Sequence, residues 1–170
     1  MLKTHSIRGV TCPSVASHRV FAWFTLQLRR LAAMLGFGRA SSANDDFDPE
    51  LREVFFAELD DVGETLNSAF AIWRVNSADQ NALKNLRRGF HTIKGSALLV
   101  GANDLGDFCR HLEQLMIRLM EQQLKVTPAM IVTVDQAIAL LPAYAIAIRD
   151  GRAPPPQARA VANRAQRLLA

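Results

Sequence analysis

The chain has 170 residues, of which 49% are hydrophobic and 7% aromatic, and its formal net charge is +4. These values suit one domain with a buried core and tails, and the sparse, clustered Pro and Gly favour helices over a β-sandwich. Residues 1–43 hold six bases and no acid, residues 44–150 hold sixteen acids and ten bases, and residues 151–170 hold four arginines. The acidic middle argues against nucleic acid as the main partner, because phosphate binding needs clustered positive charge on a folded surface.

The first 44 residues are predicted to be a basic N-terminal extension and linker. An apolar run at 20–28 is too short to span a bilayer, and two arginines follow it directly. We interpret it as an amphipathic surface helix or a poorly ordered extension rather than as a signal peptide. Cys12 and Cys109 lie far apart and form neither a disulfide framework nor a metal motif, which fits a reducing, cytoplasmic setting.

Capping patterns precede the first two predicted helices. Asp48 can accept the first hydrogen bonds, and Pro49 and Glu50 suit the first helical turn. Ser77 and Gln80 form a capping-box pattern for the second helix. Apolar residues then recur at helical spacing and predict one buried stripe on each helix: Leu51, Phe55, Leu59, Val62, Leu66, Phe70 and Trp73, then Leu83, Leu86, Phe90, Ile93, Ala97 and Val100.

Two further amphipathic segments follow a break at 101–103. A third helix is predicted from about Asp104, and a fourth runs from Thr127 to Asp150. Pro142 is expected to kink or split the fourth helix, because proline removes a backbone donor and clashes with the preceding turn. Their predicted stripes are Leu105, Phe108, Leu112, Leu115 and Leu119, then Ile131, Val134, Ile138, Leu141 and Ile148, and Trp73, Met116, Met120 and Met130 are also expected in the core.

Four helices with short connections predict an all-α, antiparallel four-helix bundle over residues 45–150 with flexible terminal extensions. Residues 151–170 are predicted to be a Pro/Ala/Arg-rich tail that ends in a short helix, from Arg159, without a packing partner. Segments 1–18, 36–44 and 151–158 are expected to be mobile, since they carry few apolar residues and several helix breakers.

The string Phe90-His91-Thr92-Ile93-Lys94-Gly95-Ser96-Ala97 carries the candidate chemistry. His91 lies about 100° around the helix from the stripe residue Phe90, so it is expected at the surface, with Lys94 and Gly95 beside it. Imidazole is a nucleophile near neutral pH, and an ammonium group stabilises phosphoryl oxygens. Gly95 costs about 1 kcal/mol in a helix interior relative to alanine. A partner that approaches closely would justify this cost.

Arg87 and Arg88 lie one turn before His91 and extend the positive charge, and Ser96 is assigned with them and Gly95 to a docking face. Each of these residues alone is most often ordinary helix surface, or in the case of Gly95 a tight helix contact. Their joint occurrence on one long amphipathic helix is what favours a functional site.

The His-x-x-Lys-Gly-Ser string, within FHTIKGSALLVGA at 90–102, resembles the signature of histidine-containing phosphotransfer (HPt) domains. It is most similar to the HPt modules of chemotaxis-type histidine kinases, including the large hybrids that control type IV pilus motility. The resemblance covers residues 47–150 and implies that His91 is the phosphoacceptor and that Lys94 stabilises phosphoryl charge. It also implies that Glu113 orients the imidazole. Arg110 stands where such kinases often have a second histidine, and that role is not transferred to the neighbouring His111.

The resemblance implies a phosphocarrier that exchanges phosphoryl groups with an aspartate of a response-regulator receiver domain and with a histidine kinase catalytic domain. No ATP-binding motif follows residue 150, no cofactor is expected, and Mg²⁺ would belong to the partner. An alternative is an unphosphorylated helical module that binds or sequesters a receiver or a kinase. Membrane contact through the basic N-terminal segment is compatible with either function. The sequence leaves open whether the chain acts alone or belongs to a larger kinase.

Overall fold

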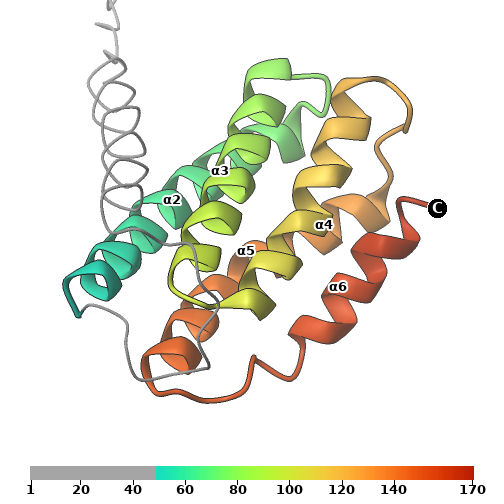
Figure 1. Cartoon of the computed structure of the whole chain (residues 1–170). Coiled ribbons are helices and arrows are strands. Elements are labelled where there is room, and N and C mark those ends of the chain that lie inside the picture. The colour runs from blue at the N-terminus through green and yellow to red at the C-terminus, as the bar shows by residue number, and fades with distance from the viewer. Residues whose placement is uncertain (1–48) are drawn as a thin grey trace, which may run out of the picture. The chain divides into compact units, whose positions relative to one another are not determined.

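The computed structural model describes residues 49–170, and five helices make up this part of the chain (Figure 1). They are α2 (Pro49–Val75), α3 (Gln80–Leu99), α4 (Asn103–Met120), α5 (Pro128–Arg149) and α6 (Ala158–Arg167). No strand occurs within the described part, which confirms the predicted all-α class. The predictions for residues 1–48, including the apolar run, the Asp48 cap and the mobile segments 1–18 and 36–44, lie outside the described residues.

Helices α2 to α5 form the predicted bundle, in which α3 packs against both α2 and α4, and α2 also packs against α5. On the α3–α4 side, His91 contacts Glu113, and Leu98 lies against Gly106, so the two helices run antiparallel. The contact between Phe108 and Tyr144, whose ring centroids are 5.2 Å apart, joins α4 to α5. Five residues from the middle of the predicted stripes lie in the core with at most 1% exposure: Leu86, Phe90, Ile93, Leu112 and Leu115. The predicted stripe residues Leu51, Val100, Ile131 and Ile148 are only half-buried.

The helix ends agree with the predicted positions, although one cap differs. Thr127 caps α5 and accepts a 3.3 Å hydrogen bond from the Met130 N–H, as its sequence position predicted. The cap of α3 is Asp79 instead of Ser77, and its carboxylate accepts bonds of 2.9 and 2.8 Å from the N–H groups of Asn81 and Ala82. The capping-box prediction was therefore wrong, because the helix begins two residues later than that pattern requires and a carboxylate caps it directly.

Helix α5 continues through Pro142, so the predicted split does not occur. By length and composition α5 is the one helix of the described part that is apolar enough to cross a membrane, with 39% of its most apolar window buried. Here it packs as a bundle helix, with Val134, Ile138 and Leu141 in the core. Because Pro142 lies on the exposed side, its ring projects away from the packed face.

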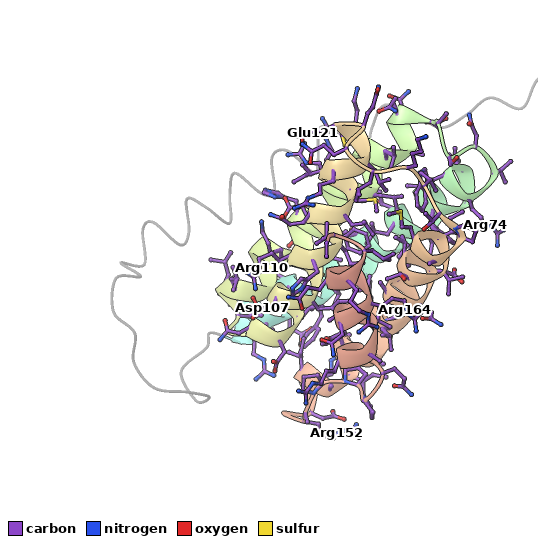
Figure 2. All side chains as sticks on the ribbon, turned by 90° about the vertical axis from the view of Figure 1, so that its right-hand side faces the viewer. Arg74, Asp107, Arg110, Glu121, Arg152 and Arg164 are labelled. Atoms are coloured by element: carbon purple, nitrogen blue, oxygen red, sulfur yellow. The ribbon has the colours of Figure 1, made fainter. Side chains whose placement is uncertain are left out.

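The predicted terminal helix exists as α6, but the expectation that it has no partner was wrong. It packs against both α4 and α5 and buries Val161 and Ala165. Arg164 of α6 donates a 2.7 Å bond to the side chain of Gln136 on α5 (Arg164 is labelled in Figure 2). Small apolar residues at helical spacing form the packed stripe of α6, and this stripe is hard to recognise in a sequence rich in alanine and arginine. Mobility of residues 151–158 stays a prediction.

Candidate functional site

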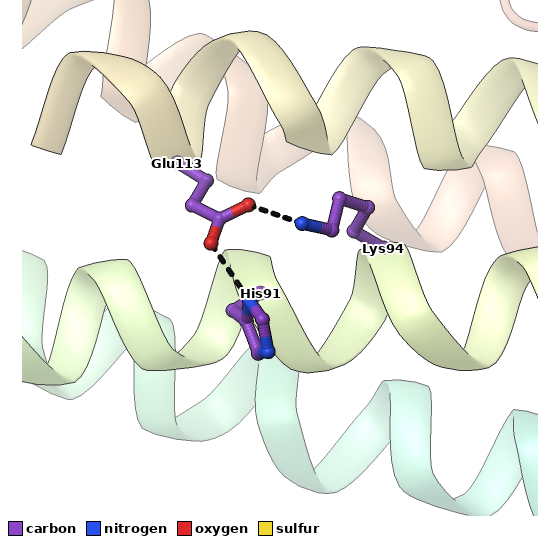
Figure 3. A network of polar contacts seen from close by, with 3 residues as sticks. All are labelled: His91, Lys94 and Glu113. Carbon is purple, nitrogen blue, oxygen red and sulfur yellow. Dashed lines mark hydrogen bonds and ion pairs between the residues drawn. The ribbon is translucent and has the colours of Figure 1, made fainter. Parts of the chain in front are cut away.

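Three polar side chains meet on the seam between α3 and α4 (Figure 3). His91 Nδ1 lies 2.7 Å from Glu113 Oε1, and Lys94 Nζ donates a 2.7 Å bond to Glu113 Oε2. The side chain of His91 is 61% exposed and that of Lys94 26%, whereas that of Glu113 is only 8% exposed. A buried carboxylate therefore links an exposed imidazole and a half-buried ammonium group. The resemblance implied the contact of Glu113 with His91, whereas its contact with Lys94 was not predicted.

The Glu113 contact fixes the state of the imidazole. A carboxylate only accepts hydrogen bonds, so Nδ1 of His91 must be the protonated, donating nitrogen. In the neutral ring the proton on Nδ1 leaves a lone pair on Nε2, and Figure 3 shows that this second nitrogen points away from Glu113. The arrangement therefore presents a nucleophilic nitrogen on an exposed side chain.

Glu113 is ionised in this setting. Burial by itself would raise its pKa, but the hydrogen bonds and charges of Lys94 and His91 outweigh burial and hold the pKa of the carboxyl below its ordinary value. The carboxylate therefore stays negative at neutral pH and can stabilise positive charge on the ring.

Core packing sets the direction of each of these side chains. Phe90 and Ile93, on either side of His91, are 0% and 1% exposed and fix the rotation of α3 about its axis. Leu112 and Met116 do the same for α4, since both are fully buried next to Glu113. The hydrophobic stripes of two helices thus determine which polar residues face one another across their seam.

Of the four residues assigned to a docking face beside His91, three are exposed and one is buried. Gly95 is exposed, and a Cβ added to it would meet no atom within 4 Å. Arg87 and Arg88 are also exposed, one turn before His91. Ser96 is 9% exposed, and its hydroxyl donates a 3.1 Å bond to the Thr92 carbonyl, so its assignment to the exposed face was wrong. Ser96 follows His91 by five positions, about 140° around α3, and this spacing turns it toward Glu58 on α2.

Arg110, which stands where chemotaxis-type kinases often have a second histidine, and its neighbour His111 make other contacts. Arg110 pairs with Asp107 at 3.0 Å, and both side chains are labelled in Figure 2. The Nδ1 of His111 donates a 2.8 Å bond to the Asp107 carbonyl, which acts as acceptor. Neither contact involves the cluster of His91, Lys94 and Glu113, so His111 has its own local environment.

Two features near the site were missed from the sequence. Glu58 on α2 is buried and faces Ser96, and Leu98 on α3 is a large apolar residue with 54% exposure. The position of Glu58 within the apolar stripe, between Phe55 and Leu59, was the available signal for the first. Leu98 follows His91 by seven residues, two helical turns, which was the available signal for the second. No group of three His, Cys, Asp or Glu suited to a metal ion occurs among residues 49–170.

A helical bundle that presents a carboxylate-oriented histidine on its surface offers an accessible nucleophile, which is what a phosphocarrier requires. The family model described as "Hpt domain" matches residues 50–144, which is more than half of the sequence. The chain therefore belongs to the Hpt family, whose members are the phosphocarriers of two-component phosphorelays.

One curated relative is the sensor histidine kinase CheAY of Helicobacter pylori (strain ATCC 700392 / 26695). It is 29% identical over 101 residues, which make up 59% of this chain and 13% of the relative. The chain thus spans a small part of that kinase. The similarity supports the resemblance to chemotaxis-type modules and says nothing of the rest of the kinase.

Proposed function

We propose that His91 accepts a phosphoryl group on Nε2 and exchanges it with an aspartate of a receiver domain. The observation that supports this most directly is the 2.7 Å contact between His91 Nδ1 and Glu113, which leaves Nε2 as the free nucleophile. The exposure of the His91 side chain gives a partner access to that nitrogen.

In the proposed step, the Nε2 lone pair attacks phosphorus and a P–N bond forms. The bond between phosphorus and the leaving oxygen breaks, and that oxygen departs as the carboxylate of the receiver aspartate or as ADP from a kinase domain. The ring keeps its Nδ1 proton and becomes positively charged. Glu113 stabilises this charge, and the reverse sequence passes the group on to the next aspartate.

Lys94 and the exposed arginines have supporting parts in the proposal. The Lys94 ammonium group neutralises phosphoryl oxygens in the transition state, while Glu113 holds it beside His91. Arg87 and Arg88 extend the positive charge, and Gly95 leaves space for a partner to approach. Mg²⁺, where the reaction needs it, is bound by the receiver or the kinase.

The wider setting is proposed on the similarity to the chemotaxis-type kinase. We place the chain in a cytoplasmic chemotaxis or pilus-motility two-component system, with a receiver and a histidine kinase catalytic domain as partners. The second candidate function is a docking module that binds a receiver or kinase without being phosphorylated. The intact His91–Glu113 contact favours phosphotransfer, since docking alone does not require an oriented imidazole.

The experiment is phosphorylation of the whole chain with phosphoramidate and with a panel of phosphorylated receiver domains. We expect one acid-labile, alkali-stable phosphohistidine, and phosphorus–nitrogen NMR should assign the group to Nε2. His91→Gln should abolish label uptake and change the free energy of unfolding by no more than about 0.5 kcal/mol, because it is an exposed polar exchange.

Label on the His91→Gln variant would move the site to His111, and His111→Gln is the matched control that should retain full uptake. Absence of label on the wild-type chain from every donor, together with tight binding to a receiver, would support the docking module instead.

A further inference from the structure

Leu98 is an exposed apolar residue that α4 holds in place. Its side chain is 54% exposed at the end of α3. A Cβ added to Gly106 of α4 would lie 3.2 Å from Leu98 Cδ2 and 3.3 Å from Cγ. The absence of a side chain at position 106 therefore lets Leu98 lie close against α4 while half of it faces solvent.

Leu98 lies on the same face of α3 as the candidate phosphoacceptor. Seven residues rotate a helix by nearly two full turns, so Leu98 is about 20° around α3 from His91 and about 10 Å along it. Gly95 lies between them and presents open space. The surface thus runs from the imidazole, across a bare stretch of backbone, to an isobutyl group, and it fits within the footprint of a docked domain.

The charge of α3 indicates which kind of partner fits this surface. Gln80–Leu99 contains four bases, Lys84, Arg87, Arg88 and Lys94, and no acid. A receiver site binds Mg²⁺ with carboxylates around its acceptor aspartate, so it is acidic and complements this helix. Leu98 lies at the end of α3 away from Arg87 and Arg88, where it offers an apolar contact beyond the charged part.

We propose that Leu98, placed by Gly106, is a specificity-determining residue that docks against an apolar patch of the receiver domain. The proposal rests on the proposed phosphotransfer function. A receiver that exchanges phosphoryl groups with this chain should carry an exposed apolar residue about 10 Å from its acceptor aspartate. Charge attracts many acidic receivers, and the apolar contact selects among them.

The test uses the whole chain and any receiver of a purified panel that takes label from the wild-type phosphohistidine. Leu98→Ala should raise the Kd for that receiver about five- to tenfold, as expected for loss of roughly half a leucine's burial. Leu98→Glu should raise the Kd further, because the new carboxylate repels an acidic receiver. Leu98→Met should keep the Kd near the wild-type value, because it conserves side-chain volume. Ile146→Ala is the matched control, since Ile146 is 52% exposed on α5.

Phosphoramidate labelling separates this proposal from the function on which it depends. All Leu98 variants should take label from phosphoramidate at the wild-type rate, because no receiver takes part. If no donor labels the wild-type chain, the phosphotransfer function fails and the Leu98 proposal with it. If the wild-type chain is labelled but Leu98→Ala and Leu98→Glu bind receivers as it does, the Leu98 proposal alone is overturned. The Leu98 proposal is likewise overturned if the two variants impair only phosphorylation of His91 by a kinase domain and leave exchange with receivers unchanged.

Discussion

Helix α3 packs over one buried glutamate on each of its two sides, and the pKa values of the two carboxyls are shifted in opposite directions. On the α4 side, both oxygens of Glu113 accept 2.7 Å bonds, one from His91 and one from Lys94. On the α2 side, Glu58 is equally buried, but its Oε2 has no partner within the described part of the chain. Burial raises the pKa of Glu58, the nearby Asp61 carboxylate raises it further, and the Ser96 hydroxyl lowers it only in part.

The comparison shows that burial alone does not decide the charge of an acid. A carboxylate is stabilised inside a bundle when cations and donors meet both of its oxygens, and it tends to become neutral when they do not. The α3–α4 seam thus holds a negative charge beside the reactive ring, and the α2–α3 seam holds a carboxyl whose pKa is raised by burial.

The same substitution in the two seams should have very different effects on phosphotransfer. Glu113→Gln removes the charge that stabilises the phosphorylated ring and loosens Lys94, so transfer should slow about 10- to 100-fold, as when a supporting partner of a functional histidine is lost. Glu58→Gln is the matched control and should stay within about twofold of the wild type. Initial rates of label transfer from phosphorylated receiver domains measure both. Equal rates in the two variants would refute the role assigned to Glu113.

Lys94→Ala should have a smaller effect than Glu113→Gln in the same seam. It removes one positive charge from the phosphoryl oxygens and leaves the nucleophile intact, so transfer should slow about tenfold without being abolished. The difference between wild type and variant should shrink at high salt, because Lys94 is partly exposed and salt screens its charge. Lys125→Ala, an exposed lysine in the α4–α5 connection, is the control and should transfer normally. Complete loss of transfer in Lys94→Ala would point instead to collapse of the site.

The smallest expected effect is on stability, and its sign depends on pH. A carboxyl whose pKa is raised by folding stabilises the protein below its ordinary pKa of 4.5 and loses that contribution as pH rises toward the raised value. Glu58→Gln stays neutral, so at pH 7 it should raise the free energy of unfolding by about 1 kcal/mol, with the gain shrinking toward pH 4.5. Urea melts of both proteins across this range measure it.

Glu113 should show the opposite pH dependence. Its lowered pKa contributes stability above the ordinary value of 4.5, and that contribution is lost as pH falls through the lowered value. At neutral pH, Glu113→Gln should therefore be less stable than the wild type, whereas Glu58→Gln should be more stable. Both differences in the free energy of unfolding should shrink as the pH falls. Two curves of the same sign would contradict the opposite pKa shifts of the two carboxyls.

The sequence by itself determined the four bundle helices, most of each buried stripe and the rotation that brings His91, Lys94 and Gly95 to one face of α3. These follow from helical periodicity and from the burial of apolar side chains, which are local properties of the chain. The resemblance to HPt domains added the pairing of Glu113 with His91, which periodicity within one helix could not give because it joins residues 22 apart.

Only the tertiary structure decided the remaining features. Three of them depend on which helix lies across each seam: the burial of Ser96 against α2, the partners of Glu58, and the contact of Leu98 with Gly106. The packing of α6 against α4 and α5 was equally hidden, because a short stripe of alanine and valine carries a weak signal until a complementary surface meets it. Burial and pairing depend on two packed surfaces, whereas the sequence of one helix specifies only the surface of that helix.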